Sequence, residues 1–206
     1  MPNQIESSYC SCCRDLFTGK TGESHLCQQC IETKPFFRLA RSVLELNEEL
    51  LTAIHAFKYK GHVHLTRPLG RLLAVGYERY YKDTPLDMII SIPAPLHRQK
   101  AYGRGFNQSY LLVTEMAKHT NLPSGMLNPF GFQRVKNTVS QAWLTRKERW
   151  KNMQGALAKK MDVTGKRILV IDDILTTGAT VNMCANVLLK NKAESVGVLT
   201  LARAPL

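Results

Sequence analysis

The sequence lacks the features of a membrane or secreted protein. No run approaches the roughly 18 consecutive apolar residues that a membrane-spanning helix requires. The first residues, Met1 to Glu6, have neither the charged start nor the apolar stretch of a signal peptide. Internal repeats and low-complexity tracts are also absent. These absences predict a globular cytoplasmic protein, and 44% hydrophobic residues in a chain of 206 are enough for a real core.

Two common nucleotide-binding loops are present only in fragments. Gly19-Lys20-Thr21 resembles the end of a P-loop, but Arg14 stands where that motif needs its first glycine. Gly103-Arg-Gly105 resembles the start of a dinucleotide-binding loop, but Gln108 stands in place of the third glycine. Neither fragment predicts a nucleotide site.

Acidic residues are scarce after residue 54. The net charge is +12, yet residues 1–54 hold five Lys/Arg against seven Asp/Glu, so residues 55–206 hold 23 against nine and carry +14. A basic surplus confined to one region predicts a polyanionic partner. The alternative is that these cations serve solubility and a small phosphate site.

The most informative stretch runs from Ile168 to Thr180. Four apolar residues lead into Asp172 and Asp173, which indicates a buried strand ending at a ligand-binding edge, where two carboxylates suit a sugar diol or Mg²⁺. The following loop offers backbone N–H groups, hydroxyls and a helix start, which together form a cradle for one phosphate. Its residues are Thr176, Thr177, Gly178, Ala179 and Thr180. The alternative is an ordinary strand and turn with one Asp capping the helix.

These thirteen residues resemble the phosphoribosyl pyrophosphate (PRPP) signature of type I phosphoribosyltransferases. The resemblance implies a ligand that combines a pentose with a 5-phosphate.

Two pairs of cysteines predict a metal site near the N-terminus. Cys10 and Cys13, then Cys27 and Cys30, form Cys-x2-Cys pairs whose spacing lets four thiolates close tetrahedrally on one Zn²⁺. Cys12 is left as a spare thiol or an alternative ligand. Disulfides are the competing interpretation, which a reducing cytoplasm disfavours.

Hydrophobic periodicity predicts alternating helices and strands. A capping box at Ser42 predicts a helix that continues to the cations and glycine of Lys58-Tyr-Lys60-Gly61. The other predicted elements are a helix over 68–81, a strand over 87–92, a helix over 106–117, a strand from 168, a helix over 181–189 and a strand over 196–202. The last three predict one βαβ unit.

Two basic segments accompany this pattern. After the strand at 87–92, Arg98, Lys100 and Arg104 are predicted to face the same edge as the two acids, where they could meet a pyrophosphate. Residues 134–151 combine six Lys/Arg with Trp143 and Trp150, a composition typical of surfaces that stack bases and hold phosphates. The alternative for the second segment is a solvated basic helix.

Taken together, these blocks resemble the ComF family of DNA-uptake competence proteins over nearly the whole chain. The resemblance rests on the module of four cysteines and the PRPP loop, and on Phe57-Lys-Tyr-Lys-Gly61, Ile92-Pro-Ala-Pro-Leu-His-Arg98, Arg104-Gly-Phe-Asn-Gln108, Ser140-Gln-Ala142 and Thr145-Arg-Lys-Glu-Arg149. It departs from the family at Ala94, where Val is frequent, and at the extra Cys12.

The resemblance implies an α/β protein with a mainly parallel sheet flanked by helices, the type I phosphoribosyltransferase fold. We expect a zinc-ribbon-like module with four cysteine ligands over 1–36 and a phosphoribosyltransferase-like domain over 37–206. The zinc module would be a structural brace or a docking surface for other DNA-uptake proteins.

Two functions follow from the resemblance. The first is a binding protein that handles single-stranded DNA entering the cytoplasm during natural transformation, with PRPP or another phosphorylated ligand in the loop. Its expected DNA contacts are Lys58, Lys60, Arg98, Lys100, Arg104, Arg146 and Arg149. The second is an active Mg²⁺-dependent phosphoribosyltransferase on an unknown acceptor, with Asp172 and Asp173 orienting the ribose diol and Arg98 and Arg104 stabilising pyrophosphate. Thr176 stands where 6-oxopurine salvage enzymes carry an acid, which disfavours that substrate class.

Overall fold

A parallel sheet forms the centre of the computed structural model, which describes residues 9–15, 17, 24–92, 108–123, 125–128, 132–134, 157–159 and 162–204. Its strand order is β1-β6-β5-β2, and every neighbouring pair is parallel. The strands are β1 (Leu39–Glu45), β2 (Met88–Ser91), β5 (Arg167–Leu175) and β6 (Ser195–Arg203). Nearly continuous apolar runs are typical of strands that are covered on both faces, and β2 and β5 fit this rule.

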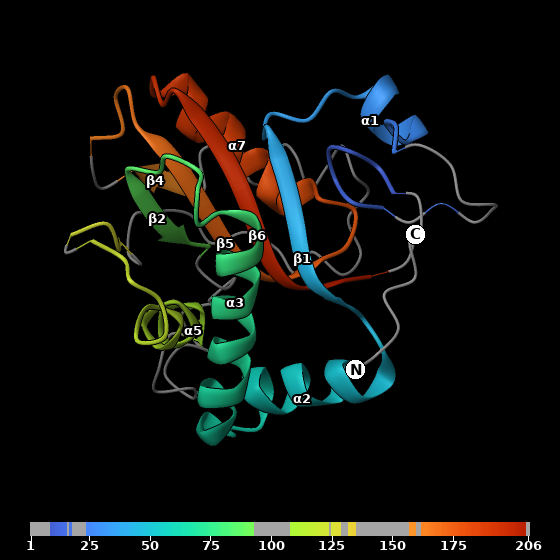
Figure 1. Ribbon diagram of the computed structural model, residues 1–206, viewed down its shortest axis with the longest axis vertical. Helices are drawn as coiled ribbons and strands as arrows, with labels where there is room; N and C mark the ends of the chain where they lie inside the picture. The colour runs from blue at the N-terminus through green and yellow to red at the C-terminus, as the bar shows by residue number, and fades with distance from the viewer. Residues whose placement is uncertain are drawn as a thin grey trace.

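Helices cover the two faces of this sheet (Figure 1). The described helices are α1 (Gln28–Glu32), α2 (Glu48–Tyr59), the short 3-10 helix η1 (Val63–Leu65), α3 (Thr66–Tyr80), α5 (Gln108–Ala117) and α7 (Ala179–Lys190). A separate antiparallel ribbon consists of β3 (Phe132–Arg134) and β4 (Leu157–Lys159). No described helix is long and apolar enough to cross a membrane.

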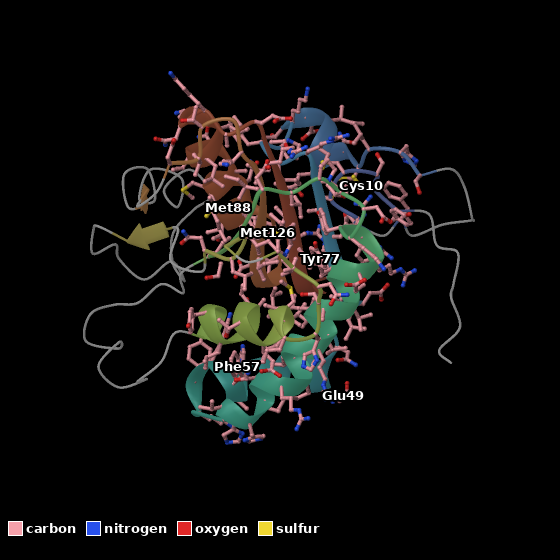
Figure 2. All side chains as sticks on the ribbon, turned by 60° about the vertical axis from the view of Figure 1, so that its left-hand side comes forward. Cys10, Glu49, Phe57, Tyr77, Met88 and Met126 are labelled. Atoms are coloured by element: carbon pink, nitrogen blue, oxygen red, sulfur yellow. The ribbon has the colours of Figure 1, made fainter. Side chains whose placement is uncertain are left out.

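Alternation along the strands divides the core into two halves. Leu169, Ile171 and Leu199 face α3 and α5, and Phe57 of α2 joins this half beneath α5 in Figure 2. Val170 and Val198 face the opposite way, toward α7. Because successive side chains of a strand point to opposite faces, one apolar run supplies both halves.

The cysteine segment belongs to the second half of the core. All four predicted ligands are buried in one cluster with residues of β5, α7 and β6. The backbone N–H of Ala40 in β1 donates to the carbonyl of Cys12 at 2.8 Å, which joins this segment to the edge of the sheet. The domain boundary at residue 36 stays a prediction.

Most predicted elements are confirmed. The helix predicted over 68–81 is α3, the strand over 87–92 is β2, the helix over 106–117 is α5, and the βαβ unit is β5-α7-β6. The predicted stop of the α2 helix is also present, with Lys60 as C-cap and Gly61 at φ 70°.

The helix start predicted at Ser42 is wrong. Ser42 lies inside β1, and its hydroxyl is buried and hydrogen-bonded to that of Thr200 at 2.7 Å. The helix begins later, where the side chain of Asn47 accepts a hydrogen bond from the backbone N–H of Leu50. A capping box is a local signal, and pairing of β1 with β6 overrides it.

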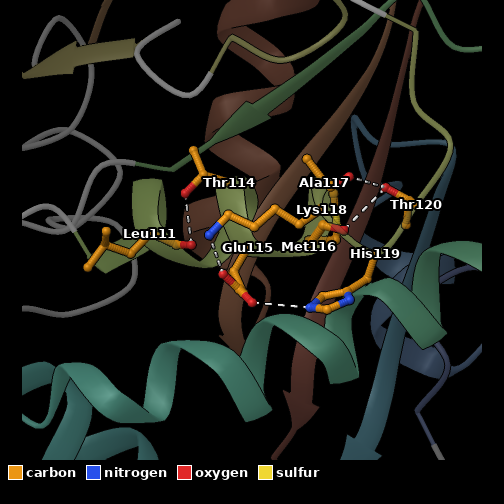
Figure 3. A network of polar contacts seen from close by, with 8 residues as sticks. All are labelled: Leu111, Thr114, Glu115, Met116, Ala117, Lys118, His119 and Thr120. Carbon is orange, nitrogen blue, oxygen red and sulfur yellow. Dashed lines mark hydrogen bonds and ion pairs between the residues drawn. The ribbon is translucent and has the colours of Figure 1, made fainter.

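Helices α3 and α5 approach closely at Gly70. A Cβ atom at this position would lie 2.6 Å from Cβ and Cγ of Glu115. Glu115 is itself held by Lys118 at 2.8 Å and by His119 at 3.1 Å, at the end of α5 (Figure 3). Glycine is therefore required here by the space between two helices.

We predict that Gly70→Ala destabilises the protein. Alanine in a helix interior normally stabilises by about 1 kcal/mol relative to glycine, but overpacking costs about 1–3 kcal/mol. The expected net loss is up to about 2 kcal/mol in the free energy of unfolding, measured by urea denaturation. Val75→Ala is the control, because Val75 is 59% exposed on the same helix and its change should stay within about 0.5 kcal/mol. A stabilised Gly70→Ala variant would contradict the close approach.

Candidate functional site

The two adjacent acids lie within β5, near its carboxyl end. The sequence predicts that the strand ends at these acids, but it continues to Leu175, and Asp172 pairs with Thr200 of β6. Asp172 accepts a hydrogen bond from the backbone N–H of Asp173 at 3.0 Å, and Asp173 accepts one from Ile174 at 2.7 Å. These local bonds hold both carboxylates at the edge of the sheet where open α/β folds bind ligands.

Lys58 forms an ion pair with Asp173. Lys58 lies in the last turn of α2, and the side chains of Lys58 and Asp173 are only 24% and 13% exposed. Burial, the largest single effect, lowers the pKa of Lys58, but the charge of Asp173, the hydrogen bond to it and further nearby acidic groups together outweigh burial and raise the pKa. The structure thus places a predicted DNA-contact residue against the acid pair.

Asp172 is an unusual carboxyl group. Burial and the neighbouring charge of Asp173 raise its pKa to about 8, against the opposing effect of Lys58. The group is therefore mostly protonated at neutral pH. Of the two adjacent acids, Asp173 is the one that forms the ion pair with Lys58.

The predicted phosphate loop, Thr176 to Thr180, comprises the turn at 176–178 and the first two residues of α7. Gly178 has φ 73°, a left-handed conformation that glycine adopts without strain, and it is the N-cap of α7. The backbone N–H of Ala179 donates to the Thr177 hydroxyl at 3.4 Å. The first N–H groups of a helix have no partner within the helix, so the loop and the N-terminus of α7 together suit an anion.

The four predicted metal ligands come together as predicted. The sulfurs of Cys10, Cys13, Cys27 and Cys30 all lie within 4.8 Å of one another and are buried. The Cys13 and Cys27 sulfurs are 3.7 Å apart, close to the roughly 3.8 Å edge of a tetrahedron with bonds of about 2.3 Å to zinc. These four cysteines could hold a metal ion.

Backbone hydrogen bonds tune this cluster. Burial alone would raise the pKa of Cys10, but N–H donors, among them Cys13 and Cys27 at 3.4 and 3.3 Å, lower it to about 7. Burial raises the pKa of Cys13 to about 12. Cys12 lies outside the cluster, and its thiol contacts the carbonyl of Arg38 at 3.9 Å.

Other predicted site residues are placed differently or not described. Lys60 is exposed at the C-cap of α2. Arg98, Lys100, Arg104, Arg146 and Arg149 lie outside the described residues, as do Trp143 and Trp150.

Sequence reasoning missed one residue beneath the loop. Arg203 is buried at the end of β6 and donates a hydrogen bond to the carbonyl of Thr176 at 2.6 Å. A charged residue at the end of an apolar strand was the available signal, but its partners are distant in the sequence.

Comparisons with known proteins agree with this geometry. The family described as phosphoribosyl transferase domain matches residues 107–205. The DNA utilization protein YhgH of Escherichia coli (strain K12) is 31% identical over 186 residues, covering 87% of this chain and 79% of that protein. Competence protein F of Haemophilus influenzae is 30% identical over 182 residues, covering 86% and 78%. The chain belongs to the ComF family.

ComF membership confirms the predicted combination of a type I phosphoribosyltransferase fold with an N-terminal cysteine cluster. Among solved structures, a hypoxanthine-guanine phosphoribosyltransferase from Bacillus anthracis aligns with a TM-score of 0.43 at 16% identity, covering 67% of this chain and 68% of that chain.

We predict that Asp172→Asn stabilises the protein increasingly as the pH rises. Asp172 keeps its proton to about pH 8 when folded, but a free Asp ionises near pH 3.9. The folded state therefore binds more protons between these values, and wild-type stability falls as pH rises through this window. The difference in unfolding temperature between variant and wild type should grow from about pH 5 to about pH 8 and level off above that pH.

Asp87→Asn is the matched control for this series. Hydrogen bonds from Arg167 hold the pKa of Asp87 below its usual range, so this carboxyl stays ionised throughout the same window. The change in unfolding temperature caused by Asp87→Asn should therefore stay constant over this pH range. Parallel curves for Asp172→Asn and wild type would contradict the assigned pKa.

Proposed function

We propose that the chain is a competence protein that handles incoming single-stranded DNA in the cytoplasm during natural transformation and binds PRPP with Mg²⁺. The names of two relatives, a DNA utilization protein and competence protein F, support the first part. One observation carries the second part: Asp172 and Asp173 stand at the carboxyl end of β5, one turn before the N–H groups of the loop and α7.

Each half of this site has a proposed partner in PRPP. The 5-phosphate binds the loop from Thr176 to Thr180, where backbone N–H groups and the helix N-terminus favour an anion. Asp172 and Asp173 accept hydrogen bonds from the ribose hydroxyls. Asp172 and Asp173 would also help to hold Mg²⁺, which would neutralise negative charge on the pyrophosphate, and Arg98 and Arg104 are the proposed pyrophosphate contacts.

The cysteine cluster would hold a structural Zn²⁺ in this proposal. Four buried thiols with no open coordination position are typical of structural rather than catalytic zinc. Docking of other DNA-uptake proteins on this module stays part of the proposal.

The match to a phosphoribosyl transferase domain favours a second candidate function, transfer of the phosphoribosyl group to an unknown acceptor. In this reaction an acceptor atom forms a bond to C1 of the ribose, and the bond from C1 to pyrophosphate breaks. The protein would supply positioning and charge stabilisation, with Asp172 and Asp173 on the diol.

We predict that Asp173→Asn weakens PRPP binding. The change removes the ionised acceptor for the ribose hydroxyls, and hydrogen bonds to charged groups contribute about 1.5–3 kcal/mol, so affinity should fall at least about tenfold. Isothermal titration calorimetry in the presence of Mg²⁺ measures the PRPP affinity of variant and wild type. Lys60→Met is the control, because Lys60 is exposed one residue beyond α2 and should leave PRPP affinity unchanged.

Equal affinity in Asp173→Asn and wild type would remove the acid pair from the binding site. The same proteins separate binding from catalysis. If wild type releases pyrophosphate from PRPP with any candidate base faster than Asp173→Asn does, the transferase function gains direct support.

We predict that binding of fluorescent single-stranded DNA is steeply salt-dependent. Several phosphate contacts should reduce affinity by on the order of 10³-fold between about 50 and about 200 mM salt. The Arg146→Glu/Arg149→Glu double variant should bind more weakly to all sequences at low salt. Lys60, Lys100, Arg98 and Arg104 are further proposed contacts, whereas the Lys58 ammonium is already engaged with Asp173.

A control for total charge uses two exposed arginines of α3. Arg67→Glu/Arg71→Glu changes the net charge by the same amount on α3. If both double variants lose equal affinity, binding follows net charge and the 146–149 segment is not a DNA site. Absence of binding at low salt would overturn the DNA-handling proposal.

A further inference from the structure

Arg203 is a buried cation that contacts two separate parts of the chain. Its side chain is 7% exposed. One guanidinium nitrogen donates to the Thr176 carbonyl at 2.6 Å, and the other lies 3.3 Å from the carboxylate of Asp15. A buried charge is costly without partners, so both contacts hold the guanidinium in place. Arg203 thereby joins the phosphate loop to the cysteine segment.

Asp15 owes its position to the first cysteine pair. The backbone N–H of Cys10 donates to the Asp15 carbonyl at 2.7 Å, and the N–H of Arg14 donates to the Cys10 carbonyl at 2.9 Å. Arg14 has φ 58°, the left-handed conformation that turns the chain after Cys13. The carboxylate that holds Arg203 is therefore fixed by the turn that presents two of the four thiols.

The second cysteine pair reaches the same loop directly. Gln29 lies between Cys27 and Cys30, and its side-chain amide donates to the Thr177 carbonyl at 3.4 Å. In addition, the side chain of Asn182 in α7 accepts a hydrogen bond from the backbone N–H of Phe36 at 2.6 Å. A cavity of about 40 Å³ lies between the two units, lined by residues that include Cys13, Cys30, Gln29, Thr177 and Gly178. Both cysteine pairs thus border the loop.

A metal ion in the cysteine cluster would restrain the shape of the cysteine segment. The four sulfurs lie within 4.8 Å of one another, so one bound ion would tie both cysteine pairs together, and without it this tetrahedral restraint is lost. Asp15 and Gln29 would then no longer be fixed. The loop would then lose its hydrogen bonds from Arg203 and from Gln29 at the same time.

We propose that a metal ion in the cysteine cluster fixes the phosphate loop through Arg203, so that anion binding at residues 176–180 depends on the metal. Arg203 is a positioning residue, because it contacts the loop from the carbonyl side and leaves the N–H groups to the ligand. The part of this inference that concerns PRPP rests on the proposed function. The part that concerns loop order does not.

The test compares hydrogen exchange of the 176–180 segment in the full chain with and without zinc. Removal of zinc by a chelator should raise exchange of this segment in wild type by about tenfold or more. Exchange of the β5 core at 169–171 should change little, which shows that the sheet remains folded. Under the same conditions, PRPP affinity with Mg²⁺ should fall about tenfold.

Arg203→Met separates the bridge from the metal. With its zinc content intact, this variant should already exchange fast at 176–180, and zinc removal should add little. Arg41→Met is the matched control, because Arg41 donates to the carbonyls of Ser11 at 3.1 Å and Cys12 at 3.4 Å but belongs to β1, away from the loop. Arg41→Met should keep the wild-type dependence on zinc. If Arg203→Met does not fold, Asp15→Asn/Arg203→Met removes both charges of the pair and serves instead.

Two results would overturn the inference. One is a hydrogen-exchange rate at 176–180 in zinc-loaded Arg203→Met that is as slow as in zinc-loaded wild type. The other is an unchanged loop in wild type after complete zinc removal. Failure of zinc-loaded wild type to bind PRPP would instead refute the proposed ligand, and the exchange comparison would still decide whether the metal orders the loop.

Discussion

Strand β5 is packed on both faces, by α3 and α5 on one side and by α7 and the cysteine segment on the other. A strand in this position cannot carry charge along its length, and the first ionisable side chains after Arg167 are Asp172 and Asp173, near its carboxyl end. The packing that forms the core therefore also sets where the polar site begins. It also desolvates Asp172, whose pKa rises to about 8 for that reason.

The elements that could be predicted are those with a complete local signal. The apolar run of β2, the helical spacing of α3 and the β5-α7-β6 unit each carry their period within one segment. The region around Ser42 could not be predicted in this way, because Ser-x-x-Glu is a capping signal only when a helix follows. There the hydroxyl pairs with Thr200 across the sheet, a contact that depends on β6 at the far end of the chain.

The same distinction explains the site. The acid pair, the phosphate loop and the two cysteine pairs are short motifs whose chemistry can be deduced from their residue types and spacing. The residues that support them are not. Lys58 reaches Asp173 and Arg203 reaches Asp15 and Thr176 only after the sheet has assembled. The sequence around Lys58 does not show whether this lysine pairs with an acidic side chain of the protein or contacts nucleic acid.

Charge balance then limits what the described part of the site can contribute to ligand binding. Lys58 is compensated by Asp173 and Arg203 by Asp15, while Asp172 is mostly protonated at neutral pH. Neither cation is therefore an uncompensated charge for a phosphate. The attraction that remains in this region comes from backbone N–H groups of the loop and the α7 dipole, which depend on orientation rather than net charge. Such a site loses affinity when its backbone loosens, so the contacts that fix the loop matter more here than they would in a pocket of free lysines.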